Sequence, residues 1–231
     1  MKKIFEKNET LFCILLIILY VVTNSYCVQS FGYTSYISCI INTIFSIALI
    51  LLIIILKRTS YYGLKKVINL KKYLYFIPLF LIVSVNLWNG INIDNSPDKI
   101  IFHILTMINI GFIEEIIFRG FLFKMMEKTN IKRAINVSAI TFGIGHIVNL
   151  LNGAELIPTL MQIGYAISLG YLFVIIFYKS KSIIPCIVTH CVINSLSIFN
   201  VENLVSIYVA SIFLILVSLI YATYINKTIK E

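Results

Sequence analysis

The chain has 231 residues, of which 59% are hydrophobic and only 13% are charged. Because a soluble domain carries about 25% charged residues, this composition excludes an ordinary soluble protein and predicts an all-α, polytopic membrane helical bundle. The formal net charge of +9 resides between the apolar runs, which is typical of membrane topology and argues against a nucleic-acid partner.

Eight apolar runs predict transmembrane helices, since a span needs about 20 apolar residues. In chain order they are residues 11–28, 37–56, 73–88, 100–123, 134–151, 157–178, 183–199 and 203–224. The third and seventh runs are short. No soluble domain, repeat or linker interrupts the series, so residues 1–231 are expected to form a single membrane-embedded domain with a motif core at about 100–199.

The charges between the runs fit the positive-inside rule. If the N-terminus is cytoplasmic, every Lys and Arg except Lys99 and Arg119 falls in a cytoplasmic loop or tail. The outer loops carry acidic residues instead, namely Asp94, Asp98, Glu155 and Glu202. The pattern predicts a multi-pass protein of the plasma membrane with both termini in the cytoplasm. The heavy use of Ile, Asn and Lys is typical of an AT-rich bacterial gene.

The fourth run contains two adjacent acids, Glu114 and Glu115, and a base, Arg119. An ionisable side chain at the centre of a membrane helix costs roughly 2.5–3.5 kcal/mol on insertion scales, so such residues need partners or a function. Glu115 and Arg119 have the i,i+4 spacing of a favourable ion pair. Glu114 points about 100° away from Glu115 around the helix and has no partner in its own helix.

Polar residues from two later runs reach the depth of Glu114. At about 1.5 Å per helical residue, Glu114 lies about 15 Å and His146 about 18 Å from the cytoplasmic end. His190 lies about 11 Å and Asn194 about 17 Å from that end, and the two share one helix face. Each of these residues taken alone would more often be structural, so their common depth is what indicates a site.

The fifth run also carries a helix-packing signal. Phe142 and His146 share one face at the i,i+4 spacing. Gly143 and Gly145 lie beside them and are expected to let a neighbouring helix approach closely.

These residues together resemble the three motifs of the CPBP family, which comprises CAAX-prenyl endopeptidases and bacteriocin-processing or immunity (Abi) proteins. The motifs are Glu114-Glu115-x-x-x-Arg119, Phe142-x-x-x-His146 and His190-x-x-x-Asn194. Their order and separations match the family, and each falls in a predicted span. The resemblance covers residues 100–199 by motif and the whole chain by topology.

The resemblance implies an intramembrane endopeptidase that cleaves a peptide bond near the cytoplasmic face. In that picture Glu114 is the general base that activates a water molecule, and His146 orients this water. His190 and Asn194 donate hydrogen bonds to the oxyanion of the tetrahedral intermediate. Glu115 and Arg119 hold the site together.

Two mechanisms remain open for this site. The family is often labelled a metalloprotease, and Glu114, His146 and His190 could supply a zinc ligand set with water as the fourth ligand. There is no HExxH motif, and the resemblance is at least as compatible with a glutamate mechanism without a metal. The metal-free mechanism, with no cofactor, is the expectation, and zinc is the alternative.

The expected partners are the lipid bilayer and a peptide or membrane-protein substrate, such as a leader peptide, a bacteriocin or a membrane-protein segment. A prenylated substrate is not expected in a bacterium. An alternative function is bacteriocin self-immunity or partner binding without proteolysis, because intact motifs can serve either role. A transporter with a carboxylate proton relay is a third reading, but the chain lacks the repeated halves with interrupted helices that such transporters have.

Overall fold

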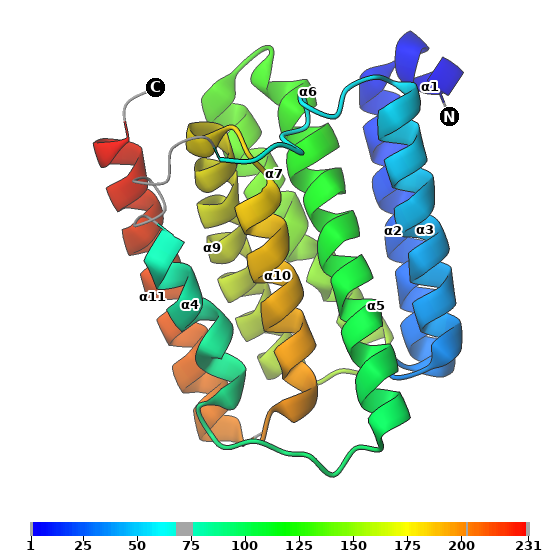
Figure 1. The fold of residues 1–231 in the computed structure, drawn as a ribbon. Coiled ribbons are helices and arrows are strands. Elements are labelled where there is room, and N and C mark those ends of the chain that lie inside the picture. Colours follow the sequence, from blue (N-terminus) through cyan, green and yellow to red (C-terminus); the bar gives the residue numbers. More distant parts are fainter. Residues whose placement is uncertain (1, 68–75, 202, 230–231) are drawn as a thin grey trace.

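The computed structural model describes residues 2–67, 76–201 and 203–229, which form a bundle of helices (Figure 1). Within these residues there is no β-strand, and a single isolated bridge pairs Ile91 with Asn200. The prediction of an all-α membrane bundle is therefore confirmed.

The helical segments follow the order of the predicted runs. They are α1 (Lys2–Lys7), α2 (Glu9–Phe31), α3 (Tyr36–Ile55), α4 (Ile77–Ser84), η2 (Val85–Leu87), α5 (Pro97–Glu115), the π-helix η3 (Ile116–Phe123), α6 (Lys124–Glu127), α7 (Ile131–Ile144), η4 (Gly145–Ile147), α8 (Val148–Leu151), α9 (Leu156–Ser180), α10 (Ile184–Leu196), η5 (Ser197–Phe199) and α11 (Leu204–Thr228).

Six continuous helical segments are long and apolar enough to cross a membrane in the part of the chain that the structure describes. The third and seventh predicted runs form the shorter apolar helices Ile77–Leu87 and Ile184–Phe199. Proline stands in the first turn of both, at Pro78 and Pro185, where its missing N–H does no harm. The predicted number of eight spans is therefore approximate: eight apolar helices occur in the predicted order, and two of them are short.

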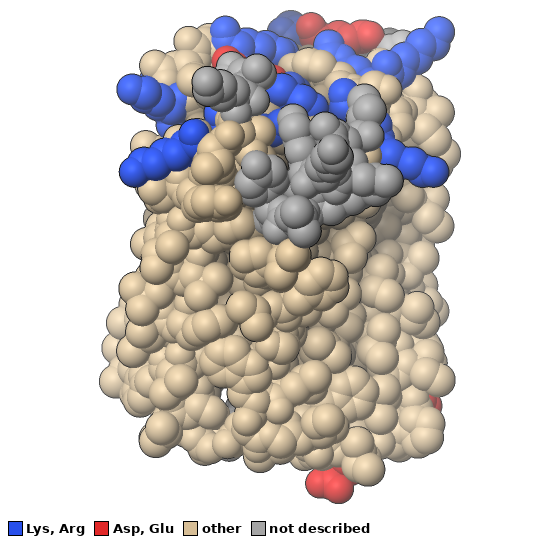
Figure 2. Space-filling model, turned by 60° about the vertical axis from the view of Figure 1, so that its left-hand side comes forward, with Lys and Arg blue, Asp and Glu red and all other residues tan. Residues whose placement is uncertain are grey.

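The loops rich in lysine and arginine gather at one end of the bundle, which we call the basic end (Figure 2). Helix α1 and the carboxyl end of α11 also lie at this end (Figure 1). This arrangement is the one that the charge pattern predicts, and the assignment of the basic end to the cytoplasm stays a prediction. Some predicted features lie outside the described residues, namely residues 73–75 of the third run, Lys71, Lys72, Glu202, Lys230 and the side chains of Lys2 and Lys3.

Two helices form the centre of the bundle. Helix α9 packs along α7 on one side and α11 on another, while α5 packs against α3 and α10. The π-helix η3 continues α5 and contacts α2, α7 and α9. All eight residues of η3 are buried, so the segment that carries Arg119 lies in the core.

Gly143 is the point of closest approach between α7 and α9. A Cβ atom added there would lie 2.7 Å from the backbone nitrogen of Ile167 and 3.0 Å from the carbonyl oxygen of Ile163. The predicted packing role of Gly143 is thus confirmed. The same prediction for Gly145 is wrong, because a Cβ atom at Gly145 would meet nothing within 4 Å.

This difference makes Gly143→Ala and Gly145→Ala a matched pair. The Gly143→Ala side chain would push α7 from α9, so we expect it to lower the free energy of unfolding by about 1–3 kcal/mol, as overpacked cores do. Gly145→Ala should leave stability nearly unchanged. Apparent melting temperatures in detergent measure both, and equal melting temperatures would contradict the assigned contact.

Candidate active site

The two glutamates lie where the central helix changes its winding. Glu114 and Glu115 are the last residues of α5, and the π-helix Ile116–Phe123 follows directly. π-helical segments are rare and occur frequently at functional sites. The wider turn keeps Glu115 and Arg119 in contact, because an Arg119 Nη1 nitrogen lies 3.1 Å from Glu115 Oε1. The ion pair expected from the i,i+4 spacing is present.

This ion pair is completely buried. The side chains of Glu115 and Arg119 are both 0% exposed. Apart from the pair, the guanidinium nitrogens have no hydrogen-bond partner among the described residues. Aromatic rings take their place: Arg119 Cζ lies 4.2 Å from the ring centre of Phe142 and 5.6 Å from that of Phe173. Cation–π attraction is strongest when the cation is removed from water, so these rings stabilise the buried charge.

His190 connects the two carboxylates. Its Nδ1 atom lies 2.8 Å from Glu115 Oε1, and its Nε2 atom lies 3.4 Å from Glu114 Oε2. An imidazolium has N–H donors on both nitrogens, so in that form His190 would donate toward both acids. Two carboxylates would then face two cations, His190 and Arg119, and the buried cluster would be electrically neutral.

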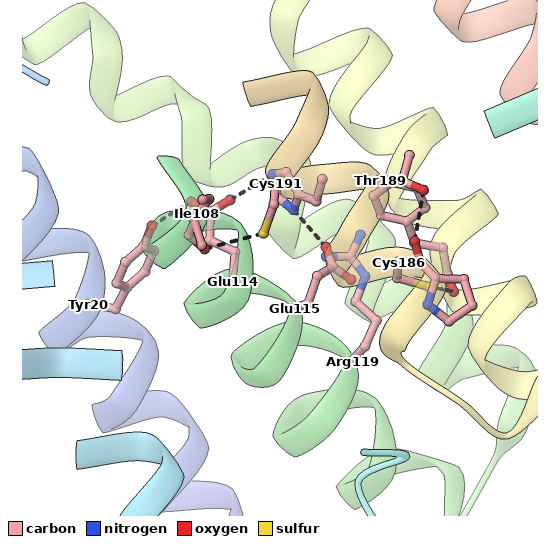
Figure 3. A network of polar contacts seen from close by, with 11 residues as sticks. Tyr20, Ile108, Glu114, Glu115, Arg119, Cys186, Thr189 and Cys191 are labelled. Carbon is pink, nitrogen blue, oxygen red and sulfur yellow. Dashed lines mark hydrogen bonds and ion pairs between the residues drawn. The ribbon is translucent and has the colours of Figure 1, made fainter. Parts of the chain in front are cut away.

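Glu114 has a further partner that the sequence analysis did not identify. The hydroxyl of Tyr20, from α2, donates a hydrogen bond of 2.6 Å to Glu114 Oε1. Figure 3 shows Tyr20 and Arg119 on opposite sides of the glutamate pair. Tyr20 lies in the apolar first span without a polar neighbour in sequence. A buried tyrosine hydroxyl needs a hydrogen-bond partner, and this was the one feature in the sequence that could have indicated the contact with Glu114.

The predicted residues meet at a cavity of about 500 Å³. Glu114, His146, His190 and Asn194 all contribute to its wall, as their common depth predicts. His146 stands in the short helix η4, with its ring 5.6 Å from that of Phe142. Among the described residues, the side chains of His146 and Asn194 make no hydrogen bond to the two carboxylates.

Glu115 and Arg119 stay outside the cavity lining. They lie behind Glu114, where the aromatic rings cover them. The structure thus separates the two acids: one lines the cavity, and the other is enclosed with its own cation.

The site was also compared with the requirements of a metal centre. Within the described residues, no three His, Cys, Asp or Glu side chains are arranged to hold a metal ion. Both ring nitrogens of His190 face carboxylates, so this residue is not free to act as a ligand in the observed arrangement. The set Glu114, His146 and His190 therefore does not fit a metal as it stands.

Comparison with known proteins identifies one family. Residues 96–196 match the family model described as Type II CAAX prenyl endopeptidase Rce1-like. This segment contains all three motifs, from Glu114 to Asn194. No curated protein and no solved structure matches the chain.

The buried ion pair leads to a test by double-mutant cycle. Arg119→Met leaves the Glu115 carboxylate buried without its cation, and we expect a loss of about 3–5 kcal/mol of stability. Glu115→Gln should be similarly damaging, because it leaves the guanidinium unpaired. The double variant should lose less than the sum of the two, since no unpaired charge remains. Apparent melting temperatures of the purified variants measure the coupling, and strictly additive losses would contradict it.

Proposed function

Since the chain belongs to the CPBP family of CAAX proteases, we propose that it is an intramembrane endopeptidase in which Glu114 activates the water molecule that hydrolyses a peptide bond. The substrate is a peptide or a membrane-protein segment. The candidate groups stand on several helices, so the proposal depends on which of them line the cavity.

The single observation that carries the proposal is the division between the two acids. Glu114 lines the cavity and retains 9% of its exposure, whereas Glu115 is 0% exposed and bound to Arg119. A general base must come within hydrogen-bond distance of the water it activates. Its place on the cavity wall supports Glu114 in this role, and the burial of Glu115 supports a structural role for the second acid.

The reaction requires two proton movements. Glu114 accepts a proton as the water oxygen bonds to the carbonyl carbon of the substrate, which gives a tetrahedral oxyanion. The carbon–nitrogen bond then breaks, and the same proton passes to the leaving amine. Tyr20 and His190 hold the Glu114 carboxylate from two sides, so that it meets the water in a fixed orientation. His146 also lines the cavity, and in the proposed mechanism it orients that water.

The oxyanion needs donors that are in place before the reaction. Asn194 and His190 both line the cavity and are one helical turn apart on α10. A single donor of this kind is typically worth about 2.7–4 kcal/mol in the transition state. Asn194 is the better-supported donor, because both nitrogens of His190 already face carboxylates.

The family supports only a broad substrate class, namely a peptide or protein. We propose a substrate without a prenyl group: a leader peptide, a bacteriocin or a membrane-protein segment. A role in bacteriocin processing is also our proposal. The expectation that hydrolysis takes place near the cytoplasmic face depends on the direction in which the cavity opens. Glu114 itself lies near the middle of its helix, about 25 Å from the start of α5 and about 20 Å from the end of α6.

Glu114→Gln tests the function directly. It keeps the size of the side chain and removes its basicity, so we expect cleavage to fall by at least about 10²-fold, the usual contribution of a general base. The measurement is mass spectrometry of a peptide library, with prenylated and unprenylated arms, incubated with purified protein in detergent. Glu127→Gln, which changes an acid paired with Lys124 at the basic end, is the matched control and should cleave normally.

Tyr20→Phe gives a graded companion to this experiment. It removes only the hydroxyl that binds Glu114, and a hydrogen bond to a charged group contributes about 1.5–3 kcal/mol. We expect a lower kcat with little change in KM.

Equal cleavage by the wild type and Glu114→Gln would refute the proposed function and favour the immunity or partner-binding role.

The metal-free mechanism is tested separately. Protein treated with a chelator and analysed for metal content should keep its cleavage rate without stoichiometric zinc. Zinc that is present in a one-to-one ratio and is lost together with activity would overturn the metal-free proposal and leave the assignment of Glu114 to the site intact.

A further inference from the structure

The cavity extends from Glu114 mainly toward one end of the bundle. On α5 its lining residues are His103, Met107, Ile110 and Glu114, which repeat every three or four residues and therefore form one stripe along the helix. This stripe runs from Glu114 away from the basic end. In the other direction, Phe118 alone continues it.

The other helices show the same direction. The lining residues fall within 142–149 on α7, η4 and α8, within 158–173 on α9, and within 190–200 on α10, η5 and the loop after it. Because α9 ends and α10 begins at the basic end (Figure 1), most of these residues lie toward the opposite end, and Leu169 and Phe173 reach past the middle of α9. The cavity thus lies mainly in the half of the bundle that is remote from the basic end.

Packed side chains lie on the side of Glu114 that faces the basic end, and a separate, smaller pocket of about 180 Å³ lies beyond them, next to Tyr61, Lys65 and Phe177. Directly behind Glu114, Arg119 lies against the rings of Phe142 and Phe173. Further toward the basic end, Phe121 contacts the ring of Tyr62 at 4.7 Å between centroids, and Tyr62 is 0% exposed. Phe121 lies in η3, two turns or fewer beyond Glu114, so this aromatic layer follows the glutamate pair closely along the chain.

Two hydrogen bonds hold the loop before residue 68 against the turn between α9 and α10, next to this aromatic layer. The carbonyl oxygen of Gly63 accepts a hydrogen bond of 2.9 Å from the Ile183 amide, and that of Lys65 accepts one of 2.6 Å from the Ser182 hydroxyl. These bonds join the loop to the turn between α9 and α10. Among the described residues, this hydrogen-bonded loop and the aromatic layer lie between the basic end and Glu114.

The wall of the open half suits a polypeptide. Its polar groups include the carboxamides of Asn149, Gln162 and Asn194 and the hydroxyl of Ser197, and within the described part of the chain no Lys or Arg belongs to the lining. Neutral donors and acceptors of this kind hydrogen-bond a peptide backbone and fix its orientation. The absence of a basic side chain from the lining disfavours recognition of a free terminal carboxylate and favours an internal peptide segment.

We infer that the substrate reaches Glu114 from the end opposite to the basic end, and that the scissile bond lies in an internal peptide segment on that side of the membrane. If the basic end is cytoplasmic, as the positive-inside rule predicts, the substrate is an exported peptide or the outer segment of a membrane protein. The inference rests on the proposed function in taking this cavity as the active-site cavity. It replaces our sequence-based expectation of cleavage near the cytoplasmic face.

Cysteine labelling tests the direction of access. The five native cysteines are buried, so single cysteines can be introduced into the full-length chain with the unmodified protein as background. Ser197→Cys and Ala166→Cys place thiols at an outer and an inner level of the cavity wall. Thr129→Cys and Asp94→Cys mark the exposed surface at the basic end and at the opposite end. A membrane-impermeant, charged methanethiosulfonate is applied to right-side-out spheroplasts and to inverted vesicles.

We expect the reagent to label the two cavity cysteines when it is added on the side from which it labels Asp94→Cys. It should label Thr129→Cys only from the other side. Labelling of the cavity from the Thr129 side would overturn the inference. Lack of reaction from either side would also overturn it, because the cavity would then be closed to water. The labelling does not require catalysis, so the two proposals can fail separately. A wild type that is inactive but labelled as expected would refute only the proposed function. A wild type that is active but labelled from the basic side would refute only the direction of access.

Discussion

The buried ion pair between Glu115 and Arg119 is the interaction on which the site depends. Neither side chain has any exposed surface, and removing such charges from water is costly unless each is matched. The match is spread over several helices: Glu115 also contacts His190 of α10, and Arg119 lies over Phe142 of α7 and Phe173 of α9. Because the same groups satisfy the charges and join the helices, the position of the catalytic candidates is coupled to the packing of the bundle.

This coupling explains how one acid can remain available. Glu115 uses its Oε1 atom for both Arg119 and His190, and its helix then presents Glu114 to the cavity. Tyr20 approaches from α2 and binds the outer carboxylate oxygen. Glu114 is therefore oriented by residues from two other helices while one side of it still faces the space that a water molecule and a substrate would need.

The bundle is asymmetric along its axis, and the asymmetry has a physical cause in the distribution of side chains. Toward the basic end, large buried aromatic residues such as Phe121 and Tyr62 pack against each other between the helices. Toward the other end, smaller residues such as Ala166 and polar residues such as Asn194 and Ser197 stand among the mostly apolar side chains of the cavity wall. The packed half supports the buried charges, and the hollow half leaves room for water beside Glu114.

The sequence alone predicts the class of protein, the order of its apolar helices and four residues that line the cavity, namely Glu114, His146, His190 and Asn194. It could do so because the cost of charge in hydrocarbon makes Glu114, Glu115 and Arg119 conspicuous, and because helical rise converts residue number into depth. It did not predict that Tyr20 binds Glu114 or that Gly145 faces open space. The tertiary structure alone decided these points, and also the direction of the cavity. Depth along a helix is a local property of the chain, whereas the filling of the space beside that helix depends on side chains contributed by distant segments.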